Sequence, residues 1–431
     1  MTLRIDDLAP GGDGVAHAVL DGERRAIFVS RVALGDEVEL AVDVSARPAR
    51  GHVVRLIHSG PGRVVPPCAY VQACGACDWM HLSRAAQRVA REDHLLRALP
   101  APFRHVPIVV HDVGHEDESS LGYRTRARLH VRASGGRAIV GPHGAGTNDI
   151  VDLSTCIVLH PALDAALAPL AALLEGAHGE GEAQIALGAA EKPVLDLRWV
   201  GRLPAAVFGR LEQLVVKGIW AGGSVYSGEV TRPAVVGDPT PRCVAADGAP
   251  FQLAPGGFAQ ASDTGNRLLG ARVLALATQT LEPGVGRGVV ELYAGAGNFT
   301  VLLARAFERV TAVESHDAAC EAARANLSAR GLSARVTCAD ADTFPIPPKT
   351  DLVVLDPPRR GARAACTALA SSSVKAIVYV SCDMPTLGRD LAILAERFEP
   401  FAIESFAMFP GTSHSETVVA LRRKPHAGRP T

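Results

Sequence analysis

The stretch VVELYAGAGNFTVLLA, residues 289–304, contains the turn that decides how the C-terminal part of the chain folds. Its first apolar residues predict a buried strand that ends at Glu291, and the apolar run after the turn predicts a helix. Gly295 and Gly297 lie between the two, where residues without a side chain let the backbone turn tightly. The stretch therefore predicts a strand, a close turn and a helix, which is the repeating unit of parallel sheets.

The same pattern repeats through the C-terminal part of the chain. Further apolar runs of strand type occupy residues 309–314, 351–356 and 376–381, and alanine-rich runs of helical type alternate with them. Such alternation is typical of βαβ units, which assemble into a mostly parallel sheet. We therefore expect a doubly wound α/β domain of the Rossmann-like kind in this part of the chain.

The residues around the glycine turn indicate the kind of cofactor. In open parallel sheets, ligands bind at the carboxyl ends of the strands, where Glu314 ends the strand after the turn. A carboxylate at this position can bind ribose hydroxyls. A dinucleotide is the rival ligand, but its fingerprint requires a third glycine where this chain has Thr300. The two glycines and this acid therefore favour S-adenosylmethionine over NAD.

Three side chains able to do chemistry follow or precede strands at this edge of the sheet. Asp356 precedes two prolines in LDPP, Cys382 lies in the turn VSCD, and Glu416 stands directly before the apolar run TVVAL. Methyltransferases that act on the amino groups of bases usually carry an aromatic residue after such a motif, and here Arg359 occupies that position. Amino-group methylation is therefore disfavoured.

A thiol and a carboxylate beside a methyl donor suit methylation of carbon 5 of uracil. That carbon is a poor nucleophile until a thiolate adds to carbon 6 and creates an enolate. A base must afterwards remove the proton from carbon 5 so that the cysteine is expelled. We expect Cys382 to be the nucleophile and Glu416 to be the base.

The remaining cysteines suggest a second site. The N-terminus has no signal sequence, and no apolar run reaches the membrane-spanning length of about 18 residues, so we expect a cytoplasmic protein whose nine cysteines stay reduced. Cys68, Cys74 and Cys77 lie close together, and Cys156 lies further along the chain. Four such thiols can hold zinc or an iron–sulfur cluster, and their spacing does not choose between the two.

Two arginine-rich stretches favour contact with nucleic-acid phosphates. Residues 45–63 contain four arginines and no acid, at the end of an N-terminal stretch whose alternation predicts a small β-barrel. In YRTRARLHVR, residues 123–132, a strand would place four arginines and a histidine on one face. Because a face of one charge repels itself unless an anion offsets it, we expect phosphate contact there, although the net charge of the 431-residue chain is only −1.

These motifs resemble those of the RNA 5-methyluridine methyltransferase family, in the bacterial branch that acts on 23S ribosomal RNA. The resemblance covers nearly the whole chain: the N-terminal module is similar to a TRAM domain, and FAQAS, ELYAGAGNFT, LDPPRRG, VSCDMPTLGRDL and MFPGTSHSET are similar to the family's blocks in order. It implies that Cys382 and Glu416 are catalytic and that the four cysteines bind a [4Fe–4S] cluster. It also implies a cofactor or pocket wall made of Gln260, Tyr293, Asn298, Glu314, Asp342 and Asp356, with Asp340 as the alternative to Asp342.

The sequence thus predicts a multidomain protein in three parts. These are an OB-like, TRAM-like β-barrel at 1–58, a central α+β domain with the cysteine cluster at 59–250, and a Rossmann-like class I methyltransferase domain at 251–431. We predict a monomer that binds RNA, preferably 23S rRNA, and binds neither DNA nor membranes. Two alternatives stay open: a tRNA uracil-C5 methyltransferase, and a non-catalytic iron–sulfur RNA-binding protein with a relic methyltransferase fold. The cluster could be structural or could sense the redox state.

Overall fold

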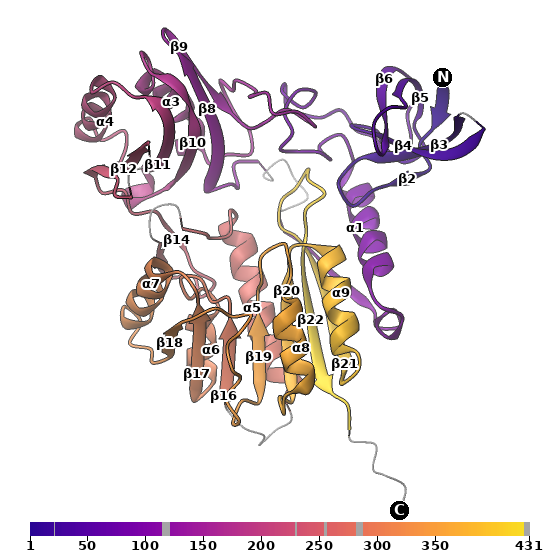
Figure 1. Ribbon diagram of the computed structural model, residues 1–431, viewed down its shortest axis with the longest axis vertical. Helices are drawn as coiled ribbons and strands as arrows, with labels where there is room; N and C mark the ends of the chain where they lie inside the picture. The colour runs from indigo at the N-terminus through magenta and orange to yellow at the C-terminus, as the bar shows by residue number, and fades with distance from the viewer. Residues whose placement is uncertain (21, 114–120, 229–230, 254–256, 282–287, 426–431) are drawn as a thin grey trace, which may run out of the picture.

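Three large sheets organise the molecule. They are a six-stranded N-terminal sheet, a six-stranded central sheet and an eight-stranded C-terminal sheet. Figure 1 shows the central sheet at the upper left, the N-terminal sheet at the upper right and the C-terminal sheet below them. The computed structural model describes residues 1–20, 22–113, 121–228, 231–253, 257–281 and 288–425.

The N-terminal sheet encloses a small apolar core. Its strands lie in the order β1-β5-β6-β4-β3-β2, and Ile5, Ile27, Val29 and Val32 in its core are fully buried. The alternation of apolar and polar residues directs one side of each strand inward, because successive side chains point to opposite faces. The strands are β1 (Thr2–Arg4), β2 (Asp7–Leu8), β3 (Gly14–Leu20), β4 (Glu23–Val29), β5 (Glu37–Asp43) and β6 (Ala49–His58).

Arginines of the acid-free stretch meet acids from other parts of the N-terminal sheet. Arg50 forms an ion pair with Asp13, and Arg63 forms one with the fully buried Asp36. Although residues 45–63 contain no acid, the folded protein places acids from other parts of the chain beside two of their arginines. The run of positive charge gives weaker support for phosphate contact than the sequence suggested.

The central sheet packs helices against one apolar core. Its strands lie in the order β13-β12-β11-β10-β8-β9, and Trp199 and Trp220 are buried in the core. The elements are β8 (Arg126–Ser134), β9 (Arg137–Gly141), α2 (Pro161–Asp164), α3 (Leu167–Leu173), β10 (His178–Leu187), β11 (Pro193–Arg202), α4 (Ala206–Val216), β12 (Gly222–Ser227) and β13 (Ala234–Gly237). The short pair β14 (Arg242–Val244) and β15 (Pro250–Gln252) follows.

The prediction that β8 carries a positive face without nearby acids is wrong. Arg128 pairs with Glu182 and Arg132 pairs with Glu180, each at 3.2 Å, because β10 lies alongside β8. Arg126 is only 8% exposed, and its guanidinium donates hydrogen bonds to backbone carbonyl oxygens inside the protein. The predicted alternation is present, but acids from the neighbouring strand offset the charge.

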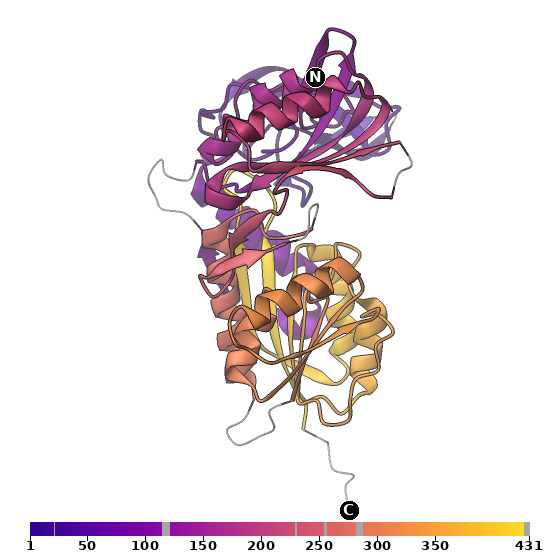
Figure 2. The ribbon, with the colours of Figure 1, turned by 90° about the vertical axis from the view of Figure 1, so that its left-hand side faces the viewer.

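The C-terminal sheet has the predicted doubly wound form. Its strands lie in the order β18-β17-β16-β19-β20-β22-β21-β7, so the chain runs outward from β16 in both directions. Val353 and Leu355 face one apolar core while Leu352 and Val354 face another, and Figure 2 shows helices on both sides of the sheet. The elements are α5 (Asp263–Thr280), β16 (Gly288–Leu292), α6 (Thr300–Ala306), β17 (Arg309–Glu314), α7 (Asp317–Ser328), β18 (Arg335–Cys338), β19 (Leu352–Leu355), α8 (Arg363–Ser371), β20 (Ala376–Ser381), α9 (Met384–Leu394), β21 (Phe398–Ala407) and β22 (Glu416–Arg423).

Part of the chain between the first two sheets also belongs to the third. Strand β7 (Ile108–Asp112) pairs in parallel with β21, and helix α1 (Arg84–Ala98) packs against α9. The backbone of Gly388 in α9 approaches α1 so closely that a side chain there would lie 2.2 Å from the carbonyl oxygen of Ala98. The N-terminal half is thus joined to the C-terminal sheet by main-chain contacts. In the described part of the chain, no helix has the length and apolar character needed to cross a membrane.

Candidate active site

The turn after β16 leaves open space at the carboxyl end of the sheet. Tyr293, Gly295 and Gly297 have positive φ values of 62°, 57° and 88°. A side chain on Gly297 would lie 3.3 Å from Ala323, whereas one on Gly295 would meet no atom within 4 Å. The backbone of Gly295 therefore faces a space that a cofactor can approach.

Glu314 is held at the end of β17 by hydrogen bonds to both carboxylate oxygens. The backbone N–H of Gly295 donates to Oε2 at 3.0 Å, and the backbone N–H of His316 donates to Oε1 at 2.9 Å. Burial raises the pKa of Glu314, but these bonds and the His316 ring lower it below its usual value. A fixed carboxylate beside the open turn suits the predicted contact with ribose hydroxyls.

Asp342, rather than Asp340, faces the glycine turn. The hydroxyl of Tyr293 donates to Asp342 Oδ1 at 2.6 Å, and Arg360 contacts Oδ2 at 2.9 Å. Asp340 is exposed and accepts a hydrogen bond from the backbone of Asp342. The geometry favours Asp342 of the two alternatives.

Gln260 lies in a segment that the central sheet holds in place. The buried Arg126 of β8 donates to the carbonyl oxygens of Gly257 and Ala259, at 2.7 and 3.2 Å. Gln260 follows these two anchors and is half-buried. The role of Arg126 in supporting this segment could not be read from the sequence, because its partners lie more than a hundred residues away.

The predicted cofactor residue Asn298 is engaged with other parts of the protein. Its carboxamide exchanges two hydrogen bonds with that of Asn266, at 2.7 and 3.1 Å, and accepts a third from the backbone N–H of Ala246. In this arrangement Asn298 ties the glycine turn to α5 rather than offering a free polar group.

The structure brings Cys382, Glu416 and Asp356 together at one edge of the sheet. Strand β20 pairs with both β19 and β22, and Ser381 lies opposite Thr417, so the residues that follow and precede them lie at the same end. Burial, together with the charges of Glu416 and Asp356, raises the pKa of the Cys382 thiol to about 12. The thiol and the two carboxylates therefore lie close enough to interact at this edge of the sheet.

Glu291 is a buried acid of this edge that sequence reasoning did not single out. It is 2% exposed, and the hydroxyl of Thr300 donates to its Oε2 at 2.6 Å. Burial raises its pKa to about 8, and burial together with the charges of Glu416 and Glu291 also raises the pKa of Asp356. Its signal in the sequence was an acid inside an apolar run.

Two family models match the C-terminal part of the chain. The model described as "Methyltransferase domain" matches residues 289–360, and "tRNA (Uracil-5-)-methyltransferase" matches residues 348–424. The second range contains Asp356, Cys382 and Glu416.

Relatives resemble the chain over nearly its whole length. A 23S rRNA (uracil(1939)-C(5))-methyltransferase RlmD from Chromohalobacter salexigens is 32% identical, and the match covers 100% of this chain and 90% of the relative. The enzyme of the same name from Alkalilimnicola ehrlichii is 31% identical, over 98% of this chain and 96% of the relative. The chain belongs to the RlmD family of 23S rRNA uracil-C5 methyltransferases.

A solved structure supports the fold. The tRNA (uracil-54, C5)-methyltransferase of Pyrococcus abyssi, solved with S-adenosyl-L-homocysteine, has a TM-score of 0.74 at 22% identity. The match covers 98% of this chain and all of that one. The predicted Rossmann-like methyltransferase architecture is confirmed, together with the predicted family.

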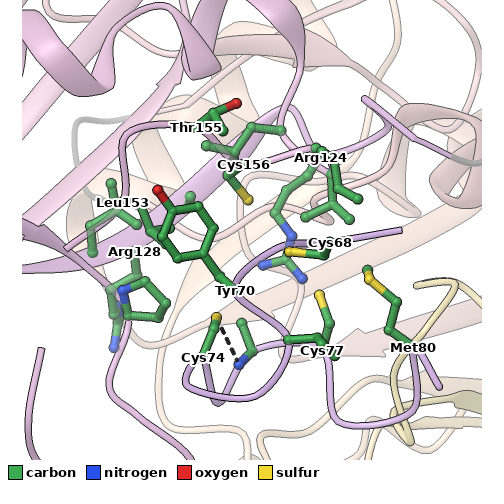
Figure 3. Close-up of a pocket in the computed structure, with 18 residues that line it drawn as sticks. Cys68, Tyr70, Cys74, Cys77, Met80, Arg124, Arg128, Leu153, Thr155 and Cys156 are labelled. Carbon is green, nitrogen blue, oxygen red and sulfur yellow. Dashed lines mark hydrogen bonds between the residues drawn. The ribbon is translucent and has the colours of Figure 1, made fainter. Parts of the chain in front are cut away.

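The four predicted ligand cysteines line one pocket. Cys68, Cys74, Cys77 and Cys156 surround it together with Arg124, and Figure 3 shows their sulfur atoms on its wall. Three of them come from the loop before α1, and the fourth comes from the segment before α2. The tertiary structure thus unites the near and the distant thiols.

The surroundings of these thiols are mainly apolar. Burial raises the pKa of Cys77 to about 12 and also raises the pKa values of Cys74 and Cys156. Arg31 of the N-terminal part donates to the carbonyl oxygens of Cys74 and Cys77 and so fixes their loop. As placed in the described ranges, no group of three or more Cys, His, Asp or Glu residues could hold a metal ion. The predicted cluster is therefore not supported by the positions of the thiols, although soft thiol ligands in one pocket are the donor set it requires.

Proposed function

We propose that this protein transfers a methyl group from S-adenosylmethionine to carbon 5 of a uridine in 23S rRNA, at the position for which its relatives are named, uracil 1939. The observation that carries the proposal is the convergence of Cys382 and Glu416 at the open edge of a methyltransferase sheet. A thiol and a base on one side of a pyrimidine ring are what methylation of its carbon 5 requires.

The side chains have distinct tasks in this reaction. The Cys382 thiol gives its proton to water at the open edge, its sulfur forms a bond to carbon 6 of the uracil, and the electron pair of the 5,6 double bond passes into the enolate. When bound, S-adenosylmethionine supplies the methyl group that carbon 5 accepts. Glu416 then removes the proton from carbon 5, the double bond re-forms, and the bond between carbon 6 and sulfur breaks. The target base must be unstacked from the RNA to reach this edge.

The glycine turn supports the cofactor assignment. Gly295 faces open space, and Glu314 presents a fixed carboxylate beside it. We assign Glu314, Asp342 and Tyr293 to the cofactor side, together with Gln260 and Asp356. We assign Asn298 a supporting role, because its carboxamide is already engaged.

Replacement of the nucleophile tests the function. Cys382→Ala should abolish 5-methyluridine formation in 23S rRNA and should form no covalent adduct with RNA that contains 5-fluorouridine. Cys243→Ser is the control, because this half-buried thiol lies in β14, outside the predicted site. Methylation by Cys382→Ala would overturn the mechanism, and a methylated position found only in tRNA would overturn the substrate.

The cysteine pocket carries a separate proposal. We propose that Cys68, Cys74, Cys77 and Cys156 hold a [4Fe–4S] cluster. Their positions in the described residues form no group that could hold a metal, and the proposal is supported by the four soft sulfur donors that line one pocket. Protein purified without oxygen should contain about four iron atoms per chain. One equivalent of zinc in place of iron would overturn this proposal.

We further propose a TRAM-like β-barrel at residues 1–58, an α+β domain at 59–250 and a methyltransferase domain at 251–431, in a cytoplasmic monomer. Size-exclusion chromatography with light scattering would test the monomer.

A further inference from the structure

The loop that leads into Glu416 is positioned by residues outside the C-terminal sheet. Trp79 donates its backbone N–H to the carbonyl oxygen of Gly411 at 2.9 Å, and Ser413 donates its own to Asp78 Oδ1 at 2.8 Å. Gln87 Oε1 accepts from the backbone of Gly411 at 3.1 Å. Figure 1 shows this connection between β21 and β22 rising from the sheet toward the N-terminal half. Residues next to the cysteine pocket therefore set the course of the loop.

This loop places one imidazole against the carboxylate of Glu416. The His414 ring stacks on the Phe409 ring, with centroids 5.3 Å apart and an interplanar angle of 29°. His414 Nε2 lies 3.4 Å from Glu416 Oε1. Arg124, which lines the cysteine pocket, also contacts Phe409: its guanidinium carbon lies 5.4 Å from the centroid of the Phe409 ring. The orientation of the imidazole is thus determined by packing rather than by the sheet.

The two oxygens of Glu416 have different surroundings. Oε1 faces His414, whereas Oε2 is buried and has no hydrogen-bond partner among the described residues. Rotation of a carboxylate about its last torsion is soft, because that torsion has broad minima. The strand therefore places the backbone of Glu416, and a second group is needed to fix the rotation of its carboxylate.

We propose that His414 is a positioning residue for the removal of the carbon 5 proton: its ring N–H holds Glu416 Oε1, so that Oε2 faces the uracil. This inference rests on the function proposed above. It assigns His414 to the second half of the reaction, after Cys382 has added to the base. The first half depends on the thiol and not on this contact.

The two halves can be measured separately. RNA with 5-fluorouridine reports adduct formation, because fluorine cannot be removed as a proton and the adduct persists. Unsubstituted RNA reports proton removal, because a slow second half leaves protein covalently attached to methylated RNA.

The variant His414→Phe keeps an aromatic ring on Phe409 and loses the N–H. It should form the fluorouridine adduct at a rate within about twofold of the unmodified protein and release product roughly 10- to 100-fold more slowly, as expected for a lost hydrogen bond to a charged group. His414→Gln, which retains an N–H donor, should restore most of the release rate.

The chain offers a matched control one strand away. His111 stacks on Phe406 with centroids 4.6 Å apart, and its Nε2 lies 2.8 Å from Glu404 Oε2. His111→Phe removes the same kind of contact from Glu404 rather than from Glu416 and should change neither rate per folded molecule.

The outcomes separate the two proposals. A His414→Phe protein that slows adduct formation and product release equally has a structural defect and overturns the positioning role, and so does one that releases product at the normal rate. Product formation by Cys382→Ala overturns the proposed function itself, whatever His414 does.

Discussion

Two buried glutamates on adjacent strands differ in how their charge is satisfied. Glu404 on β21 is 2% exposed, and Arg272 contacts both of its oxygens while His111 contacts Oε2. Glu416 on β22 is 3% exposed, and within the described residues its ion-pair partner is His414, beside Oε1. Each glutamate has a histidine neighbour that stacks on a phenylalanine, but in the described ranges an arginine pairs with Glu404 and none with Glu416.

The difference supports the proposed division between a structural carboxylate, Glu404, and the base, Glu416. Burial raises the pKa of Glu404, but hydrogen bonds from Arg272 and His111 lower it below its usual value. A carboxylate held this way is a poor base, since its proton affinity is reduced. Glu416 keeps an oxygen without a partner in the described structure, and its charge acts on Cys382, so it is the carboxylate that we propose for proton removal.

Removal of the reactive carboxylate should have the largest effect. Glu416→Gln should lower the turnover rate by about 10²- to 10⁴-fold, which is the usual contribution of a general base. Because Cys382 remains, the covalent adduct should accumulate on unsubstituted RNA, where denaturing gels can detect it. Normal turnover would mean that another group removes the proton.

The same change in the structural carboxylate should affect stability instead. Glu404→Gln leaves Arg272 without its ionic partner and should cost about 2–4 kcal/mol in the free energy of unfolding. The pKa of Glu404 is lower in the folded protein than in the unfolded chain. Ionised Glu404 therefore stabilises the folded state above the usual pKa of about 4.3, and this stabilisation is lost as the pH falls through the pKa of the folded state. Urea denaturation at several pH values measures both effects. Adduct accumulation by Glu404→Gln would contradict the distinction.

Glu291 offers an intermediate case, a buried acid with a neutral partner. Its folded pKa is raised to about 8, so the folded protein binds its proton more tightly and this group lowers stability as the pH rises from about 4.5 to about 8. Glu291→Gln should remove roughly 1–3 kcal/mol of the stability lost between about pH 6 and about pH 8. Thermal denaturation at both pH values checks this. An unchanged pH dependence would place the titration elsewhere.

The smallest effect is expected where opposite charges meet at the surface. Arg132 is paired with Glu180 across β8 and β10, and such exposed pairs contribute about 0–1 kcal/mol. Arg132→Gln should change RNA affinity by less than about twofold, since this charge is already offset. Glu180→Gln frees the arginine and should raise the affinity slightly. A large loss with Arg132→Gln in a filter-binding titration would restore the phosphate contact that the sequence suggested.

Much of the candidate site could be predicted because parallel strands end at one edge. Gly295, Glu314, Asp356 and Cys382 each follow a recognisable apolar run, so strand order alone brings them together. The arginines of β8 were misjudged for the opposite reason. Their partners Glu180 and Glu182 lie some fifty residues away in sequence and become neighbours only when β10 pairs with β8.

The sequence by itself determined the family and the doubly wound sheet, and it singled out the thiol and the base proposed for the reaction, because these depend on local periodicity and on residue types that chemistry requires. Only the tertiary structure decided which arginines have acidic partners and which group lies beside the carboxylate of Glu416. His414 reaches Glu416 because Asp78 and Trp79 hold its loop, and β7 joins a sheet built mainly from the other end of the chain. Such contacts join residues hundreds of positions apart, and no local pattern records them.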